Sequence, residues 1–205
     1  MAANNGNTEQ AILKAAEEEF IEKGLAGART VSIAEKAGVT HAMLHYYFRS
    51  KEQLYEKILE GKIDEVFASV KDAFTVPEMP LEERIKCMVR NHFNFVRKTP
   101  GLPLFIIREL TTDKKRLEIF LGRAESITPL VKEINDALEE AVSEGRIAPI
   151  SITDLVTDVV TLNVAPFIMS QLARPVLDLG GIDTETFLDQ RLEENIELIT
   201  RRLEP

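Results

Sequence analysis

Apolar residues recur at intervals of three and four positions along almost the whole chain of 205 residues. Ile12, Ala16 and Phe20 are one example, and they would share one face of an α-helix. The alternation of β-branched and polar residues that is typical of strands is missing. The sequence therefore predicts an all-α protein, with three short helices near the N-terminus followed by a larger helical bundle.

Glycine and proline indicate where the predicted helices end. Gly24 and Gly38 follow the first two helices, because glycine tolerates the left-handed backbone at a helix end. Ser50 opens a Ser-x-x-Gln capping box, and a long helix over residues 113–145 is expected to bend at Pro129. The helices predicted in this way cover residues 8–23, 30–37, 40–48, 50–74, 81–98, 102–110, 113–145, 151–173 and 184–203.

The net charge, −9 from 25 basic and 34 acidic residues, argues on its own against nucleic-acid binding, since attraction to phosphate grows with clustered Lys and Arg. Residues 29–51 are the exception in the first third of the chain. They include four cations and one acid, a net charge of +3. We therefore expect any contact with nucleic acid to come from this window.

The single cysteine, Cys87, excludes an internal disulfide and a cysteine-based zinc site, and we expect it to be a small buried side chain. The first ten residues lack the basic and apolar segments of a signal peptide. The longest run without a charge, residues 159–173, has 15 residues, fewer than the ~18–20 apolar residues of a membrane span. The sequence predicts a soluble, cytoplasmic protein without a membrane partner.

Residues 30–48 have the pattern of a helix-turn-helix. The first helix ends at Gly38, Thr40 can cap the second, and Leu44 and Phe48 are expected to pack inward because they are four positions apart. The residues at the start of the second helix then point outward. In a helix-turn-helix these residues meet base edges in the major groove of DNA.

The segment IAEKAGVTHAMLHYYFRSKEQL, from Ile33 to Leu54, resembles the DNA-binding signature of the tetracycline-repressor (TetR) family. With the apolar pattern upstream of it, the resemblance covers about residues 10–58. The residues that fall where this family reads bases are His41, Ala42, Met43 and His45. The residues that fall where it holds phosphates are Thr30, Thr40, Tyr46, Tyr47 and Lys51.

The chemistry of these side chains agrees with the roles that the resemblance implies. A tyrosine hydroxyl and a lysine ammonium donate to phosphate, an imidazole can donate to or accept from purine edges, and a methionine can contact a thymine methyl. The chain departs from many members of the family at Ala42, where glycine is frequent, and at Met43, where a hydroxyl residue is frequent. These departures affect the base preference rather than the fold.

The same resemblance implies a homodimer that binds a palindromic operator in double-stranded DNA and leaves it when a small molecule binds. It implies a DNA-binding domain over residues 1–50 and a ligand-binding and dimerisation domain over residues 51–205. The effector is unknown and expected to be apolar, and no metal or cofactor is expected. The residues expected to line its pocket are Met88, His92, Phe93, Phe95, Phe105, Phe120 and Phe167. The residues expected at the dimer surface are Val160, Val164, Phe167, Leu188, Leu192, Ile196 and Ile199.

Simpler interpretations of the same residues stay open. His41 and His45 have a spacing that can also hold zinc, and His92 is also explained as a core histidine. One of the two neighbouring tyrosines is also explained as a half-buried aromatic, and Arg49 as a solvated cation. The acidic runs at residues 17–19 and 139–140 are expected to be solvated helix faces.

The sequence contains no recognisable enzyme motif. No histidine follows a glutamate by three positions, as the di-metal sites of helical bundles require, and glycine-rich phosphate loops and nucleophile elbows are missing. We therefore predict a ligand-responsive transcriptional repressor rather than an enzyme. The alternatives are a DNA-binding regulator without an effector and a helical protein-binding or enzymatic module.

Overall fold

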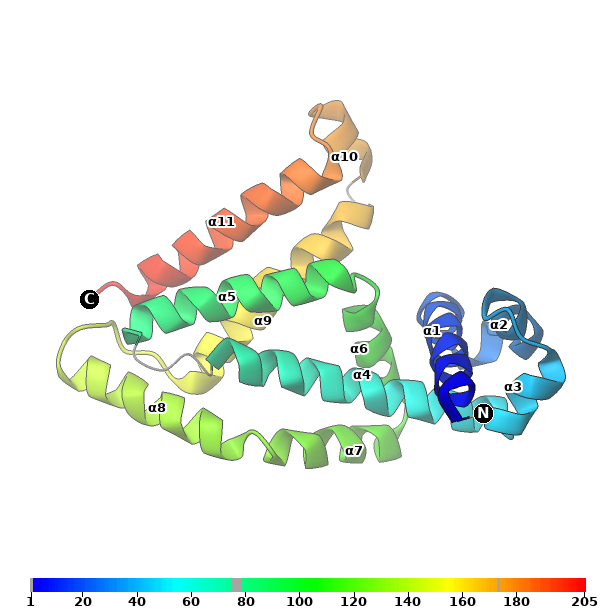
Figure 1. Ribbon diagram of the computed structural model, residues 1–205. Helices are drawn as coiled ribbons and strands as arrows, with labels where there is room; N and C mark the ends of the chain where they lie inside the picture. Colours follow the sequence, from blue (N-terminus) through cyan, green and yellow to red (C-terminus); the bar gives the residue numbers. More distant parts are fainter. Residues whose placement is uncertain (1, 75–78, 173) are drawn as a thin grey trace. The chain divides into compact units, whose positions relative to one another are not determined.

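The computed structural model describes residues 2–74, 79–172 and 174–205, and every regular element in this part of the chain is an α-helix (Figure 1). The prediction of an all-α fold is confirmed. In chain order the helices are α1 (Ala2–Gly27), α2 (Thr30–Lys36), α3 (His41–Tyr47), α4 (Lys51–Phe74), α5 (Leu81–Lys98), α6 (Leu102–Thr112), α7 (Lys114–Glu125), α8 (Thr128–Ser143), α9 (Ile152–Leu172), α10 (Arg174–Leu179) and α11 (Thr184–Leu203).

Several helix ends lie where the sequence predicts them. α2 ends two residues before Gly38, whose φ of 67° is in the left-handed region. Thr40 caps α3 because its hydroxyl accepts from the backbone N–H of Met43 at 3.2 Å. Ser50 caps α4 in the same way, from the backbone N–H of Gln53 at 3.1 Å. These caps satisfy backbone donors that a helix leaves without an internal partner.

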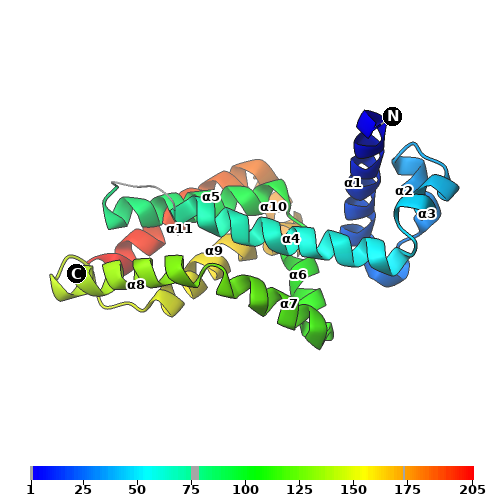
Figure 2. The same cartoon turned by 60° about the horizontal axis from the view of Figure 1, so that its bottom comes forward.

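Other boundaries differ from the prediction. α1 begins at Ala2 rather than at residue 8 and continues to Gly27, with Gly24 (φ 65°, ψ 178°) out of helical conformation. The helix predicted over residues 113–145 is divided into α7 and α8, because the chain turns between them and Pro129 lies in the first turn of α8 (Figure 2). The short helix α10 was not predicted, and the break predicted after residue 74 falls largely on residues 75–78, outside the described residues.

The chain forms two compact units. The first unit contains Met1–Glu65 and Leu104–Phe120, and the second contains Val66–Pro103 and Leu121–Pro205. α4, α6 and α7 therefore each contribute residues to both units. The functional boundary at residue 50 stays a prediction.

The first unit is built around α1, which packs against α2, and α2 packs against α3. Ile12 and Phe20 of α1, Ile33 of α2 and Leu44 of α3 are fully buried. These are residues of the apolar faces seen in the sequence, so the amphipathic pattern is sufficient to explain how the three helices come together.

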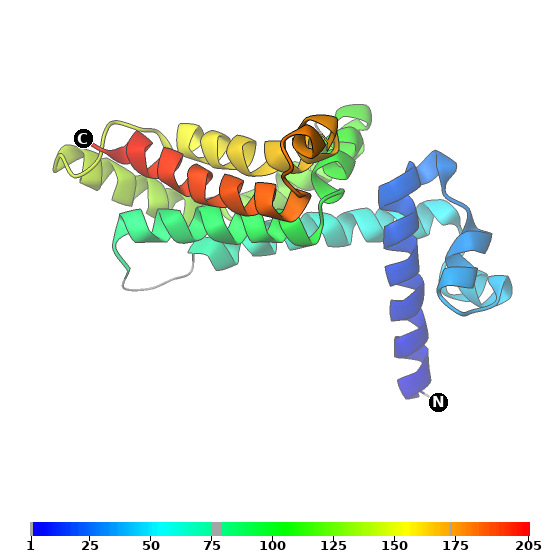
Figure 3. The same ribbon diagram turned by 90° about the horizontal axis from the view of Figure 1, so that it is seen from above.

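In the second unit α5, α9 and α11 pack against one another (Figure 3). The stretch Ile152–Ser170 of α9 has a mean hydropathy of 1.4 and is long enough to cross a membrane by length and composition alone. α9, however, also contacts α8 and α10, and it carries the fully buried Asn163, whose amide donates to the carbonyl of Val89 on α5 at 2.8 Å. These contacts make α9 part of the helical bundle of the second unit.

Candidate nucleic-acid interface

α2 and α3 form the two helices of a helix-turn-helix joined by a tight turn at Gly38. The backbone N–H of Val39 donates to the carbonyl of Ala34 at 3.0 Å and that of Gly38 donates to Glu35 at 3.1 Å, so the end of α2 is closed by the turn itself. Among the residues that the structure describes, no atom beyond the chain neighbours of Gly38 lies within 4 Å of where its Cβ would be. The glycine is therefore required for its backbone conformation and not for space.

α3 buries one side chain, Leu44, and exposes most of the others. The predicted base-reading residues His41, Ala42, Met43 and His45 are all exposed, and Met43 is 41% exposed. Leu44 is held in the core of the first unit, so the orientation of α3 about its own axis is set by that contact. The structure thus brings the four predicted residues together on one solvent-facing helix.

The imidazoles of His41 and His45 lie edge to face, with ring centroids 4.4 Å apart and an interplanar angle of 85°. His41 also reaches α2, where its Nε2 lies 2.9 Å from the hydroxyl oxygen of Thr30. The described part of the chain brings no third His, Cys, Asp or Glu into a group that could hold a metal with this pair. The polar partner that the structure provides for His41 is a hydroxyl.

A hollow lined by basic and hydroxyl side chains lies beside His45. Arg29, Thr30, Arg49, Ser50 and Lys51 line it, together with one acid, Glu35. Three cations and one acid leave this hollow positively charged, which suits a phosphate. Lys51 is the first residue of α4, and its ammonium donates to the carbonyl of Ala28, between α1 and α2, at 3.2 Å.

The remaining predicted phosphate contacts differ in exposure. Tyr46 is 79% exposed, whereas Tyr47 is half-buried, and the two rings meet edge to face at 5.5 Å. Thr40 is exposed, and since its oxygen accepts from Met43, its O–H is left to donate. All five residues that are predicted to contact DNA phosphates belong to the first unit.

Sequence reasoning overlooked one residue and left two undecided at this surface. Val31, next to Thr30 in α2, is 54% exposed on the rim of the hollow, and its apolar side chain is of the kind that contacts a thymine methyl. Arg29 and Arg49 counted towards the basic window without a role, and the structure places both in the hollow. Their place at this surface could have been predicted, because each arginine directly precedes a residue at which the sequence predicts the start of a helix.

Glu19 adds polar contacts between α1 and α2 to the apolar ones. It is fully buried, and its carboxylate accepts from Lys23 at 2.8 Å, from Lys36 of α2 at 3.0 Å and from the hydroxyl of Ser32 at 3.1 Å. These hydrogen bonds, the one from Lys23 most, lower the pKa of Glu19 from 4.5 to about 2. The expectation that residues 17–19 form a solvated face is therefore wrong for Glu19, because its partners come from residues 13 and 17 positions further along the chain.

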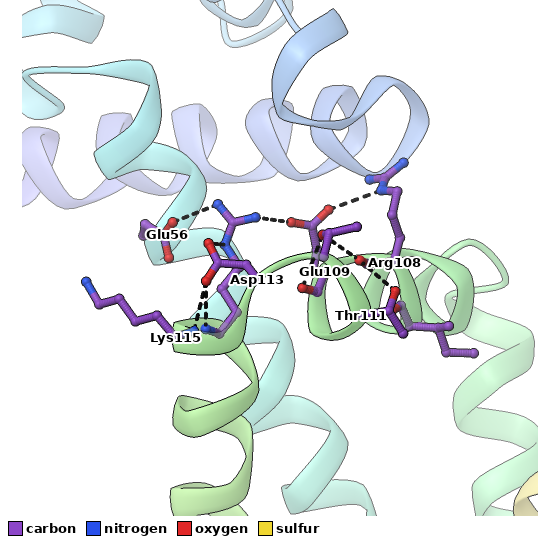
Figure 4. A network of polar contacts seen from close by, with 9 residues as sticks. Glu56, Arg108, Glu109, Thr111, Asp113 and Lys115 are labelled. Atoms are coloured by element: carbon purple, nitrogen blue, oxygen red, sulfur yellow. Dashed lines mark hydrogen bonds and ion pairs between the residues drawn. The ribbon is translucent and has the colours of Figure 1, made fainter.

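A second network ties α4, α6 and α7 together within the first unit (Figure 4). The buried carboxylate of Glu109 accepts from Arg116 and, at 3.1 Å, from Arg108, while Arg116 also donates to Glu56 of α4 at 2.9 Å. Next to this network, burial raises the pKa of Tyr55, and the Glu109 carboxylate adds to the effect. The residues 104–120 are thus joined to the helix-turn-helix unit by charged as well as apolar contacts.

The predicted pocket residues are distributed over both units. Phe105 packs against Tyr55 with ring centroids 5.8 Å apart, and like Phe120 it belongs to the first unit. Phe93 packs against Phe167, with ring centroids 4.9 Å apart, in a core cluster of the second unit. Met88 is buried in another cluster, while Phe95 and His92 are half-buried.

His92 has an environment unlike that of an ordinary surface histidine. Burial lowers its pKa to about 4, so the ring is neutral at pH 7. Its Nδ1 lies 3.2 Å from the amide nitrogen of Asn163. Because an amide nitrogen only donates, Nδ1 accepts and the ring proton resides on Nε2.

The predicted dimer residues are mostly covered by the chain itself. Phe167, Leu188, Leu192 and Ile199 are buried in the core clusters of the second unit, and their role at a dimer surface stays a prediction. Of the predicted set Val160 is exposed, at 43%, and Val164 and Ile196 are half-buried. The exposed apolar residues on α9 and α11 that the prediction did not include are Val156, Met169, Leu172 and Leu198.

Comparison with known proteins identifies the segment that carries the helix-turn-helix. Residues 12–58 match the family described as "Bacterial regulatory proteins, tetR family". The chain belongs to the tetR family. The resemblance expected from residues 10–58 is confirmed.

Relatives within the tetR family include the HTH-type transcriptional regulator RutR of Escherichia coli (strain K12), which is 34% identical over 142 residues, covering 69% of this chain and 65% of RutR. The nucleoid occlusion factor SlmA of Mannheimia succiniciproducens is 26% identical over 145 residues, covering 68% of this chain and 64% of SlmA. The chain thus spans about two thirds of the length of the curated relatives it matches.

A solved structure extends the likeness to the whole chain. It is that of a Streptomyces coelicolor protein assigned as a transcriptional regulator, with a TM-score of 0.68 over 96% of this chain and 98% of that chain. At 20% identity this likeness shows the fold alone. The tetR family fold, a helix-turn-helix followed by a helical bundle, therefore extends over 96% of the chain.

Proposed function

We propose that this tetR family protein is a homodimeric transcriptional repressor that binds a palindromic operator in the cytoplasm and leaves it when a small apolar molecule binds. The observation that carries the DNA-binding part is the exposed face of α3 next to a positively charged hollow. A helix that presents polar and apolar side chains, flanked by cations, supports insertion into a major groove with phosphates on either side.

Within this proposal, the residues that read base edges are Ala42, Met43 and His45, and the residues that hold phosphates are Thr30, Thr40, Tyr46, Tyr47 and Lys51. The hollow adds Arg29 and Arg49 to the phosphate contacts and Val31 to the groove contacts. His41, the fourth residue expected to read bases, is engaged with Thr30.

A palindromic operator requires a two-fold dimer, and α9 and α11 supply exposed apolar side chains for it. Val156 and Val160 are four positions apart on α9, Leu198 is exposed on α11, and these three are 40–45% exposed. Such side chains on long helices support a helix-to-helix contact between two copies. The homodimer is proposed to form through this surface.

The proposed effector site lies in the second unit near His92. The neutral ring, with its proton on Nε2, offers one polar donor on α5, a helix that also carries the half-buried Phe95, and small-molecule sites combine a few polar groups with apolar ones. α4 has residues in both units, so a ligand that displaces its second half would move Lys51 at its start. The ligand can shift the DNA-bound population only by its difference in affinity for the two states.

One observation favours a DNA-binding regulator without an effector. Met88, Phe93 and Phe167 are buried among other apolar side chains of the packed cores, as expected for residues whose role is to stabilise the bundle. This alternative has the same DNA-binding surface and differs in the response to small molecules.

The test of the DNA-binding function is a mobility-shift assay with duplex fragments from the region upstream of the protein's own gene. We expect a retarded complex that weakens steeply with salt, since phosphate contacts dominate the affinity. Lys51→Ala should weaken binding to all sequences alike, whereas Lys132→Ala, an exposed cation on α8, should not. Absence of a complex with any fragment would contradict the proposed function.

Base reading and ligand response need separate readouts. His45→Ala should change the ranking of operator variants, and an equal loss on every variant would remove His45 from the base-reading set. If small apolar molecules release the protein from DNA, and His92→Phe weakens this release, the proposed effector site is supported. If no such compound changes the protein–DNA complex, the regulator without an effector is favoured. Sedimentation of Val160→Glu against wild type tests the dimer, which the charge should weaken.

A further inference from the structure

The hydrogen bond between Thr30 and His41 joins the two helices of the helix-turn-helix. Thr30 is the first residue of α2 and lines the basic hollow, and His41 is the first residue of α3. Their Oγ1 and Nε2 atoms are 2.9 Å apart. The contact therefore links a proposed phosphate residue to a residue expected to read bases.

The direction of this hydrogen bond decides what Thr30 can offer to DNA. A threonine hydroxyl has one hydrogen to donate and two lone pairs that accept. If it donated to Nε2 of His41, only lone pairs would face a phosphate oxygen, and two acceptors repel. If Nε2–H donates to Oγ1, the hydroxyl hydrogen is left for the phosphate, and the contact becomes a charge-assisted hydrogen bond.

We propose that His41 is a positioning residue, whose Nε2–H donates to Thr30 so that the Thr30 hydroxyl donates to a phosphate. The inference rests on the proposed DNA-binding function and changes the role of His41 within it. Nε2 is occupied by Thr30 and one side of the ring is covered by His45, so Nδ1 is the remaining polar atom of the ring. His45 lies beside the hollow and keeps the base-reading role.

A double-mutant cycle on an operator duplex that the wild type binds tests the coupling. Thr30→Val removes the hydroxyl and His41→Leu removes the ring donor at similar size. Each should weaken binding by about tenfold per bound protomer, as for the loss of a charge-assisted hydrogen bond. The double variant should lose about the same tenfold, because the two residues act through one contact, and losses that multiply to about a hundredfold would overturn the proposal.

Rescue and operator ranking separate positioning from a structural role. His41→Gln, whose side-chain amide can donate from a similar distance, should bind within about threefold of wild type. His41→Leu should keep the wild-type ranking of operator variants, while His45→Ala should alter it. A change of ranking for His41→Leu, or no rescue by glutamine, would overturn the positioning role.

The imidazole proton gives a measurement that needs no variant. Long-range ¹H–¹⁵N spectra of the wild-type complex with DNA should show His41 with a proton on Nε2, and a ring protonated on Nδ1 alone would overturn the inference. A wild-type protein that binds no duplex overturns the proposed function and this inference with it. If the wild type binds the duplex but Thr30→Val and His41→Leu reduce the affinity independently, only this inference is overturned.

Discussion

The buried carboxylate of Glu19 allows a quantitative prediction about how α2 is held on α1. Its pKa falls from 4.5 to about 2 because Lys23, Lys36 and Ser32 donate to it, which corresponds to about 3 kcal/mol of folding free energy at pH 7. The side chains of both lysines are 38–40% exposed, so solvent screening lowers this contribution. We expect Glu19→Gln to reduce the free energy of unfolding of the first unit by about 2 kcal/mol at pH 7.

The sign of the pH dependence follows from the lowered pKa. The contribution of Glu19 is fully present above pH 4.5, the value in the unfolded chain, and is lost as the pH falls towards 2. The difference between wild type and Glu19→Gln should therefore fall by more than half by about pH 3, where the carboxyl of the unfolded chain is protonated and resembles the amide.

Urea unfolding followed by tyrosine fluorescence measures this unit selectively. The chain has no tryptophan, and its three tyrosines, at positions 46, 47 and 55, all lie in the first unit. Glu9→Gln is the matched control, because Glu9 accepts from Lys57 at 2.8 Å in an exposed pair, and its loss should cost about 0.5 kcal/mol or less. Equal stability of Glu19→Gln and wild type at pH 7, or a difference that does not change with pH, would refute the reasoning.

Three further predictions each concern a single residue. Gly38→Ala should destabilise the first unit by about 1 kcal/mol, because alanine is strained at φ 67°, while Gly61→Ala inside α4 should stabilise by roughly 0.5 kcal/mol; the reverse order in urea unfolding would contradict this. Asn195→Leu should lower the free energy of unfolding by about 1–3 kcal/mol in a circular-dichroism melt, because the buried Asn163 oxygen loses the amide that donates to it at 3.1 Å. The double variant Asn163→Leu, Asn195→Leu should lose less than the sum of the two single variants. Additive losses would contradict a coupling between the two asparagines. Lys51→Ala should reduce the slope of log Kd against log salt concentration by about 1, and an unchanged slope in a fluorescence-anisotropy titration would remove Lys51 from the phosphate contacts.

The helix-turn-helix and its exposed face could be predicted because they depend on local interactions. Thr40 and Ser50 cap backbone groups three residues away, and the positive φ of Gly38 is a property of one residue. Leu44 is the apolar residue that α3 buries, so its position in the sequence predicts which side of α3 faces solvent. The same reasoning predicted one helix over residues 113–145, where the structure has α7 and α8. A proline such as Pro129 is compatible both with a bend and with the first turn of a new helix.

The burial of Glu19 and the core positions of Leu188 and Leu192 could not be predicted in this way. An acidic run on an amphipathic helix is most often solvated, and only the approach of Ser32 and Lys36 makes a buried carboxylate stable. An apolar stripe shows that a helix face must be covered. It does not show whether another helix of the chain or a second copy covers it.

The residue pattern alone therefore determined that this chain is helical, that it contains a helix-turn-helix, and which side chains of the second short helix meet solvent, since spacing, caps and glycine conformation act over a few residues. The tertiary structure decided which carboxylate is buried, that Thr30 and His41 share a hydrogen bond, and which apolar residues belong to the chain's own core. These depend on contacts between residues far apart in sequence, and the free energy of such contacts is defined only once the helices have packed.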